Sequence, residues 1–89
     1  MREFVLRLFF GEVTSSDRAA SLAAALRLSG GMVRYLDRRE KTGLSTSTVV
    51  VRDPDDFRER LGATSWGEHL VGITVESVSR ELSPTGPLN

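Results

Sequence analysis

The chain has no cysteine among its 89 residues, a single histidine, three prolines and few aromatic residues. The absence of cysteine excludes a disulfide scaffold, a cysteine-based zinc finger, an iron–sulfur cluster and a thiol nucleophile. Twelve basic side chains are balanced by twelve acidic ones, and the formal charge is therefore zero. No overall field attracts nucleic acid or an acidic membrane, and we expect any binding to be local.

Long hydrophobic runs are also missing. The apolar stretch over residues 4–10 is interrupted by Arg7 and is too short to cross a bilayer. No small-residue cleavage site follows it, which argues against a secretory signal. These features predict a cytoplasmic protein that does not associate with membranes.

The first half of the chain predicts a strand followed by a helix. Alternation over residues 3–10 places Phe4, Leu6, Leu8 and Phe10 on one face and Val5, Arg7 and Phe9 on the other. After Gly11, the residues Thr14 to Ser16 offer helix N-caps, and Thr14 with Asp17 has the spacing of a capping box. The predicted buried stripe of the helix is Ala19, Leu22, Ala23 and Leu26, and the glycines at 30 and 31 should end it.

The second half predicts a hairpin, a short helix and a final strand. The strands of the hairpin cover residues 32–39 and 45–52, joined by a turn at 40–43. Asp53 and Pro54 start the second helix, and Gly62 should stop it. Residues 63–69 receive no assignment. The last strand covers residues 70–82, with Val71, Ile73 and Val75 expected to face the core.

The order β, α, β, β, α, β predicts an α+β, ferredoxin-like fold, with a four-stranded antiparallel sheet and both helices on one face. We expect a single domain over residues 1–82 and a flexible C-terminal tail over 83–89. The second face of the sheet is then left bare, and its central strands present Val5, Arg7, Phe9, Thr46, Thr48 and Val50. A face with this much apolar surface predicts packing on a partner, most economically a second copy related by a two-fold axis.

No arrangement of residues points to catalysis or a metal. His69 is the only histidine; Glu68 beside it points elsewhere in a helix or a strand, and no serine lies in a Gly-x-Ser-x-Gly elbow. Asp53, Asp55 and Asp56 are explained by capping and the helix dipole. We therefore expect no catalytic residue, no metal and no cofactor. The basic residues Arg34, Arg38, Arg39 and Lys41 are interpreted as a charged strand edge, and the third strand has no aromatic to stack on bases, which makes nucleic acid an unlikely partner.

Two features carry functional hypotheses. The loop from strand to first helix could hold a small anion or an amino acid, through Gly11, Glu12, Ser15, Ser16, Asp17 and Arg18; plain helix capping is the alternative. Trp66, the only tryptophan, is either a lid on the core or an interface anchor beside Val5, Arg7, Phe9, Thr48 and Val50.

The pattern resembles the ACT family of small regulatory domains. The residues that carry the resemblance are Asp17-Arg18 with Ser21-Leu22-Ala23, Gly31 before Val33-Arg34-Tyr35-Leu36, and Val49 to Asp53. Ala19-Ala20 stands where that family usually has Pro-Gly. The resemblance implies a non-catalytic domain that dimerises and senses an amino acid near Gly11 and Glu12.

We accordingly expect a small binding or regulatory domain that self-associates through its sheet. The alternatives are a small enzyme of the dimeric α+β barrel type, with Arg7, Tyr35 or His69 as polar groups, and a protein-interaction module.

Overall fold

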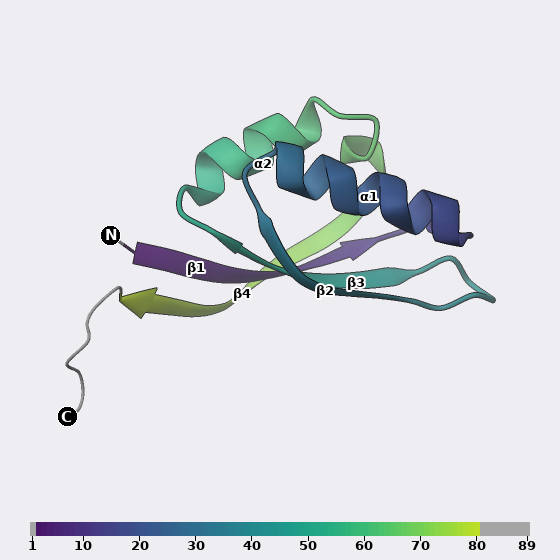
Figure 1. The fold of residues 1–89 in the computed structure, drawn as a ribbon, viewed down its shortest axis with the longest axis horizontal. Coiled ribbons are helices and arrows are strands. Elements are labelled where there is room, and N and C mark those ends of the chain that lie inside the picture. The colour runs from purple at the N-terminus through teal and green to yellow at the C-terminus, as the bar shows by residue number, and fades with distance from the viewer. Residues whose placement is uncertain (1, 81–89) are drawn as a thin grey trace.

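The computed structural model describes residues 2–80, which form a four-stranded antiparallel sheet with two helices on one side (Figure 1). The elements are β1 (Arg2–Phe10), α1 (Ser16–Leu28), β2 (Met32–Arg38), β3 (Ser45–Val51), α2 (Pro54–Gly62), the short 3-10 helix η1 (Gly67–His69) and β4 (Leu70–Arg80). The strand order is β2-β3-β1-β4. The predicted α+β ferredoxin-like fold is confirmed. The predicted tail over 83–89, and residues 81–82 of the predicted domain, lie outside the described residues.

β1 is a central strand and pairs with β3 on one side and β4 on the other. Its inner face carries Leu6, Leu8 and Phe10, each at most 1% exposed. Opposite them on β3 lie Val49 and two serines, since Leu8 pairs with Ser47 and Phe10 with Ser45. The helices cover this inner face, and the core lies between the two layers.

The N-cap of the first helix is one of the three residues predicted for it. Ser15 is the cap, and its Oγ accepts a hydrogen bond of 3.1 Å from the Arg18 N–H. With the cap at Ser15, the third helical residue is Arg18, whose cationic side chain cannot complete a capping box. The predicted box between Thr14 and Asp17 is therefore wrong, although Asp17 does lie in the positive first turn.

The end of α1 was predicted correctly. Gly30 has a φ of 100°, a left-handed conformation that favours glycine. The N–H of Gly30 donates to Arg27 and that of Gly31 donates to Leu26, the paired hydrogen bonds of a Schellman cap. A side chain at Gly31 would also collide with Phe57 of α2, with a Cβ only 2.8 Å from Cε1. Glycine here lets the start of β2 approach the second helix.

The buried face of α1 is rotated slightly from the predicted stripe. Leu22 and Leu26 are buried as expected, but the third buried residue is Ala25, while Ala19 and Ala23 are half-buried. In α2, the Asp53 carboxylate accepts a hydrogen bond of 3.1 Å from the Asp56 N–H, and Phe57 and Leu61 are buried. Asp53 and Pro54 start this helix as predicted, and Gly62 is its last residue.

β4 departs from the predicted alternation. Ile73 pairs with Leu8 on the inner side and packs against the core, but Val71 is 71% exposed and Val75 is 59% exposed. The pairing with β1 shifts register between Phe9 and Phe10, where Val71 is the extra residue. The expectation that Val71 faces the core is therefore wrong. Val75 is on the core side of the sheet, as predicted, but remains exposed.

Candidate functional site: the outer face of the sheet

The face of the sheet away from the helices is built from residues paired across the two central strands. Val5 pairs with Val50, Arg7 with Thr48 and Phe9 with Thr46. Directly opposed residues of antiparallel strands share a face, and the intervening residues of β1 are in the core. All six residues predicted for the bare face thus lie together on it. We call them, with Met32, Tyr35 and Asp37 described next, the outer face.

Three further residues of the outer face come from β2: the apolar Met32 and Tyr35, and the acidic Asp37, which pairs with Thr46. Met32 pairs with Val50, and Tyr35 pairs with Thr48, so both continue the apolar row outward from the centre. They are 61% and 52% exposed. Strict alternation separates positions 32 and 35 onto opposite faces, and only the register shift between Val33 and Tyr35 unites them. The sequence analysis did not place these two residues on this face, since a bulge has no dependable signal in the sequence.

The side chains at the centre of the outer face are shielded from solvent, even though no helix or strand covers this face. Thr48 and Val50 are only 6% and 8% exposed. Both belong to β3, an interior strand whose short side chains stand between larger ones from β1 and β2. Phe9 is half-buried and lies opposite Gly72 of β4, which leaves space beside its ring. The outer face therefore has a tight floor, with the exposed apolar side chains of Met32 and Tyr35 on its β2 side and the polar residues Thr74 and Ser77 on its β4 side.

Arg7 provides the positive charge at the centre of this face. Its Nη2 lies 3.1 Å from Oε1 of Glu76, so the pair leaves no net charge there. The Nε of Arg7 and the Oγ1 of Thr48 are buried and have no hydrogen-bond partner within the described residues. Each unsatisfied buried group costs about 1–3 kcal/mol, and such groups are uncommon in native proteins.

Trp66 does not belong to the outer face. It is 1% exposed and lies in the core, with its ring edge-on to Phe10 at a centroid distance of 6.1 Å. Its Nε1–H donates to the Ser21 hydroxyl at 3.1 Å, and the Arg18 guanidinium carbon lies 4.1 Å from the ring centroid. Of the two roles proposed for Trp66, the structure supports the one in the core, and the interface role needs correcting.

The predicted ligand loop is occupied by contacts of its own. The Arg18 Nε–H donates to the Glu12 carbonyl at 3.1 Å, and the Arg18 backbone N–H is taken by the Ser15 cap. The Gly11 N–H donates to the carbonyl of His69, and Ser16 accepts a long bond of 3.4 Å from Arg38. Glu12 has a φ of 64°, unusual for a residue with a side chain. The six predicted residues, with Asp17 in the first turn, are neighbours in space, and ligand binding there stays a prediction.

The polar groups considered for an enzyme are not gathered at one place. Arg7 and Tyr35 flank Thr48 on the outer face, whereas the His69 ring packs edge-on against Trp66, with centroids 5.4 Å apart. Among residues 2–80 there is also no group of three acidic or histidine side chains placed to hold a metal ion.

Comparisons of the chain with protein-family models, curated proteins and solved structures found no match. None of the helices within residues 2–80 has the length and apolar character needed to cross a membrane. Function is therefore inferred from the exposed surfaces of the fold and the chemistry that they carry.

Proposed function

We propose that this protein is a non-catalytic binding domain that pairs with a second copy of itself through the outer face of the sheet. The observation that supports this most is the apolar row formed by exposed Met32 and Tyr35 and half-buried Val5 and Phe9, beside the buried Val50, on a face that no helix covers. Exposed apolar patches of this kind usually mark an interaction site.

The charges of the outer face disfavour an acidic partner. Arg7 and Glu76 neutralise each other, and Asp37 of β2, opposite Thr46 on the same face, adds a negative charge, so a nucleic acid or an acidic peptide is not attracted there. A two-fold axis would set the same neutral pair against its own copy, where Arg7 of one protomer could exchange partners with Glu76 of the other. The pair is therefore compatible with self-association.

The size of the face limits how much surface a dimer can bury. Four strands about 4.8 Å apart and about seven residues long, at ~3.3 Å per residue, give roughly 400–450 Å² in projection. A standard interface buries about 800 Å² of accessible surface per partner, and smaller ones are usually weak. We therefore expect a reversible dimer with a dissociation constant of tens of micromolar, on the order of −6 to −7 kcal/mol.

The ACT-like resemblance adds a regulatory interpretation to this proposal. Domains of that kind associate and respond to a small molecule, and the shared element order supports a role of this type. A domain that catalyses no reaction acts on other molecules only through the proteins that it binds. The dimer would therefore be the functional unit.

The test is the molecular mass in solution across a wide range of protein concentration, measured by analytical ultracentrifugation. The wild type should move from monomer to dimer between about 1 and 500 µM, around the expected dissociation constant. Phe9→Glu and Tyr35→Glu should shift the midpoint upward at least tenfold, because each places a charge on the apolar row. A wild type that remains monomeric throughout contradicts the proposal.

A matched control separates association from general effects of charge. Ala24→Glu adds the same charge at an exposed position of α1, on the layer away from the outer face, and should leave the midpoint unchanged. Tyr35 is half exposed in the protomer, so its substitution should fold normally even if Phe9→Glu does not. An equal shift in Ala24→Glu and Tyr35→Glu would contradict a role for this face.

A further inference from the structure

A second opening lies on the other side of the sheet, between α2 and β4. Helix α2 has only nine residues, and it leaves the inner side of β4 partly uncovered. The result is a groove of about 700 Å³, within the range typical of sites for small molecules. The groove is lined by residues of β1, of the first half of α2 and of β4.

The floor of the groove is apolar and continuous with the core. Phe4, Leu70 and Ile73 pack against the buried cluster, and Leu6 belongs to it. Val75 and Val78 extend the floor but remain 59% and 48% exposed. Because these valines already lie on the inner side of the sheet, a ligand that covered them would add apolar burial at about 25 cal/mol per Å² without unfolding anything.

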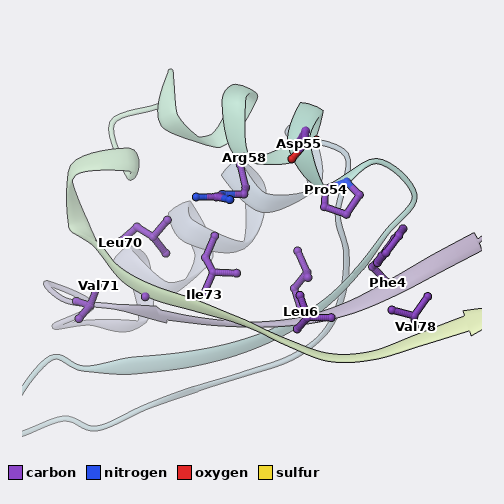
Figure 2. A pocket seen from close by; sticks show the side chains of 11 residues that line it. Phe4, Leu6, Pro54, Asp55, Arg58, Leu70, Val71, Ile73 and Val78 are labelled. Carbon is purple, nitrogen blue, oxygen red and sulfur yellow. The ribbon is translucent and has the colours of Figure 1, made fainter.

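One cationic side chain, that of Arg58, lies over this apolar floor. In Figure 2 the Arg58 side chain descends from α2 and its guanidinium lies above Ile73. No hydrogen bond or ion pair holds Arg58 within residues 2–80, whereas Arg60 of the same helix is paired with Asp56 at 3.0 Å. An unpaired guanidinium beside an apolar surface suits a planar carboxylate, which it can bind through two parallel hydrogen bonds.

Asp55 limits the charge of such a ligand. It lies on the rim of the groove one turn before Arg58, above Pro54 in Figure 2. A second negative charge on the ligand would be repelled there, so a single carboxylate fits better than a phosphate or a dicarboxylate. The apolar body then lies away from Asp55, on the floor formed by Ile73 and Val75.

We infer that the groove between α2 and β4 binds a monocarboxylate with an apolar tail, such as a medium-chain fatty acid. Arg58 binds the carboxylate, and Ile73, Val75 and Val78 receive the tail. This site is on the opposite side of the sheet from the proposed dimer face, so the two proposals stand independently.

The experiment is a titration of the full chain with decanoate, kept below the concentration at which decanoate forms micelles and followed by NMR of the backbone amides and methyl groups. Signals of Ile73, Val75 and Val78 should shift, and 1-decanol, which has the same tail without the charge, should bind at least fivefold more weakly. No shift, shifts elsewhere, or equal binding of the alcohol would overturn the inference.

Variants test each part of the site. Arg58→Gln should weaken decanoate binding at least fivefold, while the matched control Arg60→Gln should change it less than twofold. Val75→Asp puts a carboxylate on the exposed part of the floor and should weaken binding at least tenfold. Unchanged binding in Arg58→Gln overturns the assignment of Arg58. If groove signals of Tyr35→Glu, the variant designed not to associate through the outer face, instead shift with protein concentration in the absence of decanoate, a second copy occupies the groove and the inference is wrong.

Discussion

Phe9 and Phe10 are neighbours in the chain and lie on opposite faces of one sheet. Phe10 is fully buried under the helices and contacts Trp66, whereas Phe9 is half-buried on the outer face opposite Gly72. The inner face thus completes its core within one protomer, and the outer face leaves apolar groups unburied. The comparison separates the residues that make the protomer fold from those available to bind something else.

The largest expected effect is the difference between the two phenylalanines. Phe10→Ala should lower the free energy of unfolding by about 3–5 kcal/mol, since it removes a fully buried ring and leaves a cavity. Phe9→Ala should cost about 1–2 kcal/mol in dilute protein, because only part of its ring is shielded from water. Urea denaturation at low micromolar protein measures both. Equal losses would show that the outer face is as important to the protomer as the core.

Substitution of Trp66 tests how much the stability of the core depends on contacts between segments that are distant in the sequence. Trp66→Phe keeps an aromatic ring but loses the hydrogen bond to Ser21 and weakens the contact with Arg18. We expect a loss of about 2–3 kcal/mol from the smaller ring together with the unpaired polar groups. Thermal unfolding followed by circular dichroism gives the change. A loss below 1 kcal/mol would place the indole outside the cooperative core.

Substitution of two adjacent residues of β3 should give a smaller change in the free energy of unfolding, and this change should be an increase. Ser47 on the inner face and Thr48 on the outer face both have buried hydroxyls without a partner in the described chain. Ser47→Ala should raise the free energy of unfolding by about 1 kcal/mol, because it removes an unsatisfied group with little change in volume. Thr48→Val should also stabilise the protomer, and the urea midpoint reports both changes. If Ser47→Ala is destabilising, its hydroxyl has a partner that the fold does not reveal.

The ion pair on the outer face should matter least to folding. Arg7 and Glu76 have side chains that are 41% and 38% exposed, and exposed pairs contribute about 0–1 kcal/mol. Glu76→Gln should therefore change stability by less than 1 kcal/mol in dilute protein. Repeating the measurement in high salt should remove most of the effect by screening. A larger loss that resists salt would show that the pair is fixed more firmly than its exposure suggests.

Much of this fold could be predicted from the sequence because its signals are local. The start of α2 at Asp53-Pro54 and the end of α1 at Gly30 each depend on a few neighbouring residues. The outer face of β1 and β3 followed from alternation alone. Because local signals of this type do not depend on the rest of the chain, the features that they predicted are present in the structure.

The failures involve contacts between distant residues or irregular pairing. Residues 63–69 had no assignment because Trp66 is held by Ser21, 45 positions earlier in the chain. The position of Val71 depends on a register shift, and that of Tyr35 on another. The groove was not predicted at all, because it exists only where α2 is too short to cover β4. The closest indication in the sequence was that α2 has a single apolar pair, Phe57 and Leu61, which predicts a short helix.

The central position of β1 has a consequence for how the protein is made. β1 is the first strand to be synthesised, yet its partners β3 and β4 begin about 35 and 60 positions after it ends, at Ser45 and Leu70. During translation, β1 can pair with β3 only after residue 51 has left the ribosome, and with β4 only after nearly all of the described chain has done so. Pairings this distant in sequence slow folding and expose strands that can aggregate. Arg7, which interrupts the apolar residues of β1, is then a feature that would reduce aggregation of the nascent strand while it waits.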